Sequence, residues 1–283
     1  MSRWIVETDW LENHLDAPDI VVVDGSWHLP AANRDPRAEY LERRIPGAVF
    51  FDIDDISDTG SSLPHMLPSP EKFASRMRRM GIGDGARVVV YDAAGLFSAA
   101  RVWWMFRVMG HDDVAVLDGG LPKWIAEGRP LADGPPRPRQ ERHFTARLQT
   151  MMVRDRDDVA RASANGSAQI VDARAAGRFA GEAPEPRAGL RAGHIPNSRN
   201  VPYDALLGPD KTLKSADEIR AIFEAAGVDL ANPIVTTCGS GVTAAVLSLG
   251  LAVNDRLDTG LYDGSWTEWG ADPSLPIETG GPG

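Results

Sequence analysis

The sequence is poor in cysteine: its 283 residues contain one, Cys238. A single cysteine cannot form an intramolecular disulfide, so any sulfur chemistry in this chain is that of a thiol. Basic residues are in the minority, with 30 Lys and Arg against 40 Asp and Glu and a formal net charge of −10. This balance argues against a nucleic acid or an anionic membrane as a partner, because both call for a basic surface.

Long apolar runs are also missing. No uncharged apolar run approaches the roughly 18 residues that a membrane-spanning helix needs. The N-terminal residues mix acids with apolar side chains, so no secretory signal is visible. No group of His, Cys and Asp has the spacing of metal ligands, and nothing in the sequence implies an organic cofactor. We therefore expect a soluble, cytoplasmic protein that needs neither metal nor cofactor.

What the chain does have is the same pattern twice. Four pairs of similar segments keep their order, at an offset that stays near 150 residues. The pairs begin at Ile20 and Gln169, at Tyr40 and Gly189, at Ala86 and Asn232, and at Val116 and Leu261. Chance matches would not keep order and offset together. The sequence therefore predicts a duplicated domain.

Each copy alternates short runs rich in Val and Ile with helical stretches. The predicted helices cover residues 69–80, 98–109, 215–226 and 243–252. Gly81, Gly110 and Gly227 stand where a glycine closes a helix. Uninterrupted apolar runs such as Val88–Val90 predict strands buried on both faces, which is typical of a parallel sheet. The predicted fold class is α/β, with a mostly parallel sheet flanked by helices in each copy.

The stretch between the copies, residues 129–144, is rich in Pro and Arg and has no apolar periodicity. This composition suits a semi-rigid, extended linker. We set the N-terminal domain at residues 1–137, the linker at 138–152 and the C-terminal domain at 153–283.

Cys238 follows Ile234–Thr237, a run that predicts a strand, and precedes the helix expected from Thr243. In an open parallel sheet, ligands bind beyond the carboxyl ends of the strands. Gly239, Ser240 and Gly241 are small, so the backbone can curl and aim successive N–H groups at one point, where the helix start adds a positive field. This setting favours the thiolate, and we predict a partly exposed nucleophile.

The alternative interpretation is a buried, inert cysteine, because free cysteine behaves as a small hydrophobic residue. The duplication argues against it. Asp92 stands where the first copy should have a cysteine, while Gly95 still matches Gly241. The second copy is therefore predicted to be the catalytic one. Phosphatases of the Cys-x5-Arg type need an arginine six positions after the cysteine, and Ala244 at that position disfavours phosphoryl transfer.

The duplicated α/β pattern, the Cys-Gly-Ser-Gly-Val-Thr loop at 238–243, Gly-His-Ile-Pro at 193–196 and the motif Phe-Phe-Asp-Ile-Asp…His-Met-Leu-Pro at 50–68 resemble the two-domain rhodanese-type sulfurtransferases. The resemblance covers nearly the whole chain. Members of that family that use thiosulfate carry basic side chains in the loop, as Cys-Arg-Lys-Gly. Gly239 and Ser240 instead resemble the branch that uses 3-mercaptopyruvate.

The resemblance also implies roles for residues at the site. Arg178 and Arg187 match the substrate-binding arginines of the family, and arginine suits a carboxylate or an α-keto acid because it offers paired N–H donors. The loop residues Gly239, Gly241, Val242 and Thr243 would surround the substrate sulfur.

Proton transfer is a further role that the resemblance implies. It assigns this role to Ser240 together with His65 and Asp54 of the first domain, which would make the site an inter-domain one. A turn serine, a loop histidine and an aspartate at a helix start are the competing interpretations.

By this resemblance, Cys238 takes sulfur from 3-mercaptopyruvate as a persulfide, releases pyruvate, and passes the sulfur to thioredoxin, a small thiol or cyanide. Two alternatives stay open. One is a thiosulfate:cyanide sulfurtransferase. The other is a persulfide carrier or redox module that binds a partner without turnover, against which the arginine pair argues.

Overall fold

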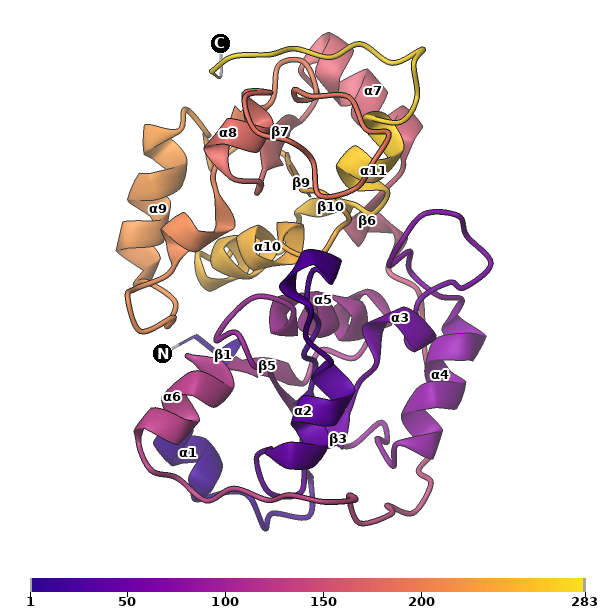
Figure 1. Cartoon of the computed structure of the whole chain (residues 1–283), viewed down its shortest axis with the longest axis vertical. Coiled ribbons are helices and arrows are strands. Elements are labelled where there is room, and N and C mark those ends of the chain that lie inside the picture. The colour runs from indigo at the N-terminus through magenta and orange to yellow at the C-terminus, as the bar shows by residue number, and fades with distance from the viewer. Residues whose placement is uncertain (1, 282–283) are drawn as a thin grey trace. The chain divides into compact units, whose positions relative to one another are not determined.

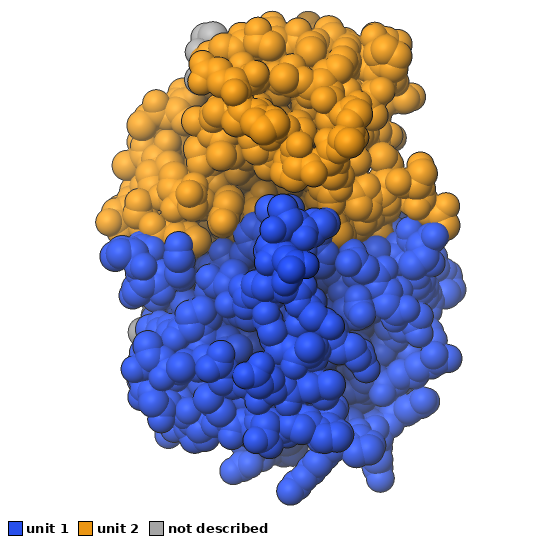
Figure 2. Space-filling view, viewed as in Figure 1, with its two compact units in different colours: residues 1–59, 67–149, 208–213 blue, residues 60–66, 150–207, 214–283 orange. Residues whose placement is uncertain are grey.

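The chain forms two compact units, shown in different colours in Figure 2. The structure is a computed structural model and describes residues 2–281. Unit 1 comprises residues 1–59, 67–149 and 208–213, and unit 2 comprises residues 60–66, 150–207 and 214–283. Each half of the sequence therefore gives one short segment to the unit built from the other half. The linker limits set from the sequence, residues 138–152, remain a prediction.

The two exchanged segments correspond to each other in the duplication. His65 of the first and Lys211 of the second are separated by the same number of residues as Asp92 and Cys238. Both adopt left-handed backbone angles, with φ of 62° at His65 and 67° at Lys211. This conformation is uncommon outside glycine. The two copies therefore share the backbone of this loop although its side chains differ.

Unit 1 is built on a five-stranded sheet in the order β1-β5-β4-β2-β3, and all its strand pairs are parallel. Its strands are β1 (Ile5–Val6), β2 (Ile20–Asp24), β3 (Val49–Phe50), β4 (Arg87–Tyr91) and β5 (Val114–Leu117). The central strand β4 places Val88, Val89 and Val90 in the core with no exposed surface. A strand covered on both faces explains why this run is apolar without alternation.

Unit 2 repeats the same architecture with the order β6-β10-β9-β7-β8, again entirely parallel. Its strands are β6 (Val153–Arg154), β7 (Gln169–Asp172), β8 (Arg199–Asn200), β9 (Ile234–Thr237) and β10 (Gly260–Tyr262). The strand orders of the units are identical once the numbering is shifted. The predicted duplication and the predicted parallel α/β fold are both confirmed.

Helices flank the sheet in each unit (Figure 1). In unit 1 they are α1 (Thr8–Glu12), α2 (Pro36–Glu42), α3 (Ile53–Ile56), α4 (Pro70–Arg79), α5 (Ala99–Val108) and α6 (Gly120–Ala126), with the 3-10 turn η1 (Pro30–Ala32). In unit 2 they are α7 (Arg156–Asn165), α8 (Ala176–Phe179), α9 (Ala216–Ala225), α10 (Ala244–Val253) and α11 (Ser265–Trp269), with η2 (Thr150–Met152) and η3 (Tyr203–Leu206).

The four helices predicted from the sequence are α4, α5, α9 and α10, each within a residue or so of its expected limits. Glycines follow α4, α5 and α9 with φ of 71°, 81° and 75°, at Gly81, Gly110 and Gly227. These angles are those of a residue that ends a helix in the left-handed region. Among residues 2–281, no helix combines the length and the apolar character needed to cross a membrane.

The Pro-rich segment after α6 has no helix or strand over residues 133–149, and part of it packs firmly on unit 1. Phe144 has no exposed surface and its ring lies 5.7 Å from that of Phe73 and 6.2 Å from that of Phe106. Farther along, the N–H of Arg147 donates to the carbonyl of Met109 at 2.8 Å. Burial of one large aromatic side chain is enough to anchor such a segment. This stretch is therefore part of the core of unit 1 as well as a connection.

Candidate active site

Cys238 lies where the sequence places it, directly after β9 and before α10. The loop between them turns at Gly241, whose φ is 75°. The loop is also fastened to α11. The N–H groups of Trp266 and Thr267 donate to the carbonyls of Cys238 and Gly239, both at 2.9 Å. The cysteine therefore sits at the carboxyl end of a central parallel strand, held between the starts of two helices.

The prediction of a partly exposed thiol is wrong, because Cys238 is 2% exposed. The hydrogen bonds from α11 hold the loop against unit 2, and the side chain of Cys238 is enclosed as a result. Burial alone does not make the thiol inert. Among the described residues, no acceptor is found for the loop N–H groups of Gly239, Ser240, Val242 and Thr243. Such unpartnered donors are expected at a helix start and favour a bound anion.

Ser265 is a residue of this site that sequence reasoning missed. Its Oγ accepts hydrogen bonds from the N–H groups of Cys238 at 3.3 Å and Gly241 at 3.1 Å. The side chain is fully buried, and the backbone has a φ of 50°. One signal was available in the sequence. Aligning the two copies pairs Ser265 with Gly120, so a serine stands where the other copy has glycine.

The corresponding loop of unit 1 contains an anion of its own. The carboxylate of Asp92, which stands in place of Cys238, accepts hydrogen bonds from the N–H groups of Ala94, Phe97 and Ala99, all at 2.8 Å. Asp92 is 1% exposed, so these bonds satisfy a buried charge. The first copy thus shows that a loop of this shape holds an anion by its backbone.

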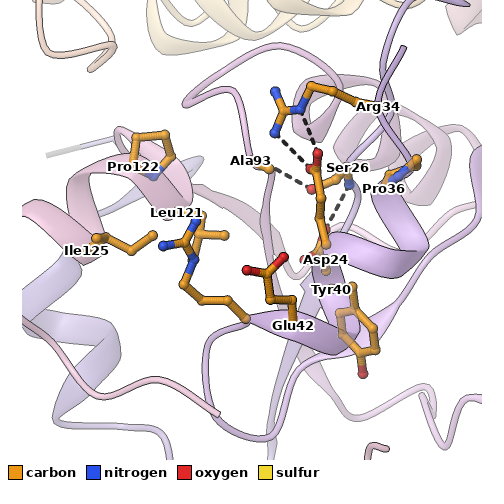
Figure 3. A pocket seen from close by; sticks show the side chains of 12 residues that line it. Asp24, Ser26, Arg34, Pro36, Tyr40, Glu42, Ala93, Leu121, Pro122 and Ile125 are labelled. Carbon is orange, nitrogen blue, oxygen red and sulfur yellow. Dashed lines mark hydrogen bonds and ion pairs between the residues drawn. The ribbon is translucent and has the colours of Figure 1, made fainter. Parts of the chain in front are cut away.

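Beside this loop, unit 1 has a cavity of about 420 Å³, whose lining residues are shown in Figure 3. It opens beyond the carboxyl ends of β2 and β4, the edge at which unit 2 carries Cys238. Arg34 and Glu39 form an ion pair on its wall, with Nε and Oε1 2.6 Å apart. Burial raises the pKa of Asp24 in its floor to about 6. The first copy keeps a cavity at this edge but offers no nucleophile.

Arg178 lies against the cysteine loop. A Cβ atom built on Gly239 would stand 3.0 Å from the Nη2 of Arg178, so a side chain at position 239 would make a tight contact with this guanidinium. The same Nη2 donates to Oε2 of Glu185 at 2.5 Å. The Nε of Arg178 is buried without a partner among the described residues. At least one N–H donor of Arg178 therefore has no acceptor among the described residues.

Glu185 is a second residue that the sequence did not single out. It is a nearly buried carboxylate, 4% exposed, that joins Arg178 to Arg174, whose Nη1 lies 2.8 Å from Oε1. Arg174 also pairs with Asp172 at 2.7 Å and lies over the ring of Trp266 at 4.3 Å. Burial opposes the charge of Arg174, but its two ion pairs outweigh burial and raise its pKa. Arg174 is thus a structural arginine, and Glu185 holds Arg178 to it.

Arg187 and His65 lie next to each other. The Nη2 of Arg187 is 3.3 Å from the Nε2 of His65, which is 5% exposed and belongs to the segment that the first half of the chain gives to unit 2. Asp54 is in unit 1, where it accepts a hydrogen bond from Nε1 of Trp27 at 3.1 Å. The described residues show no hydrogen bond from Ser240 to His65. The proton-transfer role of Ser240, His65 and Asp54 stays a prediction.

No metal-binding site is found in the part of the chain that the structure describes. No group of three or more His, Cys, Asp or Glu side chains is placed there to hold a metal ion.

Comparison with known proteins identifies the family to which this fold belongs. Residues 7–127 and 155–272 each match the family of the rhodanese-like domain. The chain is 47% identical to the 3-mercaptopyruvate sulfurtransferase of Escherichia coli K12, over 98% of both chains. It is 43% identical to the thiosulfate sulfurtransferase of Bos taurus, over 95% of this chain and 92% of the relative.

Among solved structures, the chain is similar to SseA of Escherichia coli, a 3-mercaptopyruvate sulfotransferase with the rhodanese fold. The TM-score is 0.86 at 45% identity, over 93% of this chain and 98% of that one. The order of the strands, the repeated loop and these matches agree over nearly the full length. The chain belongs to the rhodanese-like domain family and contains two such domains in tandem.

Proposed function

We propose that the protein is a sulfurtransferase that moves the sulfur of 3-mercaptopyruvate to a thiol or to cyanide through a persulfide on Cys238, with release of pyruvate. The family and the name of the Escherichia coli relative support transfer of sulfur from this donor. The persulfide and the roles of individual residues are our inference from the site.

The observation that carries the proposal is the anion held in the first copy. The N–H groups of Ala94, Phe97 and Ala99 bind the Asp92 carboxylate, and they correspond in sequence to those of Ser240, Thr243 and Ala245. Two of the latter, Ser240 and Thr243, have no acceptor among the described residues, whereas Ala245 donates to the carbonyl of Val242 at 3.3 Å. Cysteine has a shorter polar reach than aspartate, so a bare thiolate at position 238 would leave part of that space empty. A second sulfur added to Cys238 extends the side chain, and we propose that this persulfide sulfur takes the place that a carboxylate oxygen has in unit 1.

The first half-reaction starts with attack of the Cys238 thiolate on the sulfur of 3-mercaptopyruvate. A bond forms between the two sulfur atoms while the C–S bond of the donor breaks. The electron pair of that bond passes to carbon and gives the enolate of pyruvate, which takes up a proton to become pyruvate. Loop amides are suited to stabilise the persulfide, and Ser240, with His65 and Asp54, is proposed to handle the proton.

The donor carboxylate and keto group need cationic donors. Arg178 suits this role because it adjoins Gly239 and its Nε has no partner among residues 2–281, while Arg187 lies beside His65. Paired N–H groups on each guanidinium match an α-keto acid, and the same groups oppose the negative charge that develops as the enolate forms. Arg178 and Arg187 are therefore proposed to bind the donor and to stabilise its leaving group.

The second half-reaction returns the enzyme to its starting state. An acceptor thiolate attacks the outer sulfur, a new S–S bond forms on the acceptor, and the bond to Cys238 breaks with its electrons on the Cys238 sulfur. We propose thioredoxin or a small thiol as the acceptor. A persulfide cycle of this kind needs thiols that stay reduced, and on that ground we propose the cytoplasm as its compartment.

Thiosulfate is the second candidate donor, because the bovine relative named for it is nearly as similar to this chain as the relatives named for 3-mercaptopyruvate. Overall identity therefore does not decide the donor. The loop favours 3-mercaptopyruvate. The Nη2 of Arg178 lies 3.0 Å from where a Cβ at position 239 would stand, so a basic side chain there, of the kind that suits a sulfur dianion, would crowd and repel this guanidinium.

The test is a comparison of pyruvate release and of cyanide-dependent sulfur transfer with both donors. We expect kcat/KM to be higher for 3-mercaptopyruvate than for thiosulfate, and Cys238→Ser to release no pyruvate. A clear preference for thiosulfate would reverse the choice of donor. Turnover that persists in Cys238→Ser would remove the persulfide from the mechanism. A stable complex with a partner protein but no turnover with either donor would identify a carrier instead.

A further inference from the structure

We propose that the hydroxyl of Ser265 is the positioning group that keeps the cysteine loop in its anion-binding shape when no anion is bound. The proposal rests on the proposed role of Cys238 as the sulfur carrier. It concerns a residue on α11, outside the loop, that acts on the sulfur only through the backbone of the loop.

The hydrogen bonds of Ser265 are arranged for this purpose. Its Oγ donates to the carbonyl of Tyr262 at 2.8 Å, so its proton is already committed. The lone pairs then face the loop, where they accept from the N–H groups of Cys238 and Gly241. The two amides lie on either side of Gly239 and Ser240. One oxygen atom thereby fixes both ends of the segment whose N–H groups would meet the persulfide.

Unit 1 shows how the loop is held when this hydroxyl is missing. Gly120 corresponds to Ser265, and one neighbouring contact is shared: Leu121 donates to the carbonyl of Asp92 at 3.0 Å, as Trp266 does to that of Cys238 at 2.9 Å. Unit 1 has no room for a side chain here, because a Cβ on Gly120 would stand 2.5 Å from a backbone carbonyl oxygen of the loop. There the Asp92 carboxylate gathers three loop amides by itself. A permanent internal anion organises the first loop, so no hydroxyl is needed.

No permanent internal anion can organise the loop of unit 2, because the anion bound there must arrive and leave in every catalytic cycle. Between cycles, several N–H groups of the loop would point at the same small space with nothing to bind, an arrangement that favours opening of the loop. A fixed acceptor behind the loop removes this tendency. Ser265 has that position, since it binds amides that the persulfide does not need.

The backbone at this position supports the same interpretation. The φ of 50° at Ser265 and of 55° at Gly120 lies in the left-handed region, which glycine adopts at less cost than any residue with a Cβ atom. Serine is therefore the costlier residue for this turn. Its four hydrogen bonds, which include those to Tyr262, Cys238 and Gly241, offset that cost.

The experiment compares Ser265→Ala and Ser265→Gly with the wild type. Both variants lack the hydroxyl, and the glycine variant also relieves the backbone. Ser198→Ala is the matched control, because Ser198 is a buried serine of the same unit whose Oγ donates to the carbonyl of Ile195 and does not contact the loop. Thermal unfolding of each protein identifies the variants that fold.

Two measurements read the loop. The rate of alkylation by iodoacetamide reports on Cys238 alone, because it is the only cysteine of the chain. Steady-state pyruvate release from 3-mercaptopyruvate gives kcat and KM separately. We expect both Ser265 variants to lose roughly tenfold or more in kcat, as for loss of two hydrogen bonds, with KM little changed. The rate of alkylation should rise in both, because an opened loop exposes a thiol that is 2% exposed in the closed loop. Ser198→Ala should match the wild type in both measurements.

Folded Ser265 variants that alkylate and turn over like the wild type would overturn the proposal. So would a loss in Ser265→Ala that Ser265→Gly restores, because the backbone and not the hydroxyl would then be responsible. If the wild type fails to use 3-mercaptopyruvate, the proposed function is wrong, but the alkylation rates still decide the role of Ser265.

Discussion

Substitution of Asp92 tests directly how these loops bind anions. Asp92→Ala removes the acceptor of three hydrogen bonds, those from Ala94, Phe97 and Ala99, and leaves three amides without that partner in a buried place. Asp92→Asn is the finer perturbation, because it keeps the shape of the side chain and removes its charge.

The expected magnitude follows from the three bonds. Hydrogen bonds to a charged group contribute about 1.5 to 3 kcal/mol each. Part of this total is needed to remove the carboxylate from water. We therefore expect Asp92→Ala to lower the free energy of unfolding by on the order of 3 to 5 kcal/mol. Asp92→Asn should lose less, because its carbonyl oxygen still accepts from some of the amides.

The assay is urea denaturation followed by tryptophan fluorescence, with pyruvate release measured on the folded protein. Since Asp92 is outside the catalytic unit, kcat per folded molecule should stay close to that of the wild type. A loss of stability below about 1 kcal/mol in Asp92→Ala would contradict this prediction, because this loop would then gain little from holding an anion. The proposed binding of the Cys238 persulfide by loop amides would then lose its support.

Three further predictions concern other parts of the site and the fold. Glu185→Gln should raise KM for 3-mercaptopyruvate and cost about 2 kcal/mol of stability, because it removes the charge that holds Arg178 beside the loop; a KM equal to that of the wild type would contradict this placement. Burial raises the pKa of Asp24 to about 6 from an ordinary 3.8, so between these values the folded protein keeps a proton that the unfolded chain has released, and stability falls as the pH rises. Asp24→Asn should reduce that fall by on the order of 3 kcal/mol between about pH 4 and about pH 7, and unfolding curves with an unchanged pH dependence would count against it. Phe144→Ala should cost about 3 to 5 kcal/mol in urea denaturation because it empties a core position, whereas Leu148→Ala, at an exposed site, should cost little.

The sequence was sufficient for the elements whose signals are local. Helix α4 begins after Ser69, whose Oγ accepts from the N–H of Lys72, and it ends before a glycine. Helix α9 has a complete capping box between Ser215 and Glu218. Such caps are made by residues three apart, so they can be recognised without the fold. Cys238 was placed correctly for the same reason, since strand, glycine loop and helix follow each other directly.

Features that depend on distant contacts could not be predicted. Whether Cys238 is exposed depends on how α11 packs on the loop, and that contact joins residues 28 positions apart. The role of Ser265 follows only from the amides whose hydrogen bonds it accepts, and the role of Glu185 only from the two arginines that it joins. None of these partners is adjacent in the sequence. The exchange of residues 60–66 and 208–213 between the units is likewise a property of the fold.

Intact mass spectrometry after exposure to 3-mercaptopyruvate is the decisive measurement of whether Cys238 carries the sulfur. We expect the wild-type protein to gain the mass of one sulfur atom on Cys238 and to release pyruvate in equal amount. Later addition of a thiol should remove the extra mass. Release of pyruvate without any gain of sulfur on Cys238 would contradict the account.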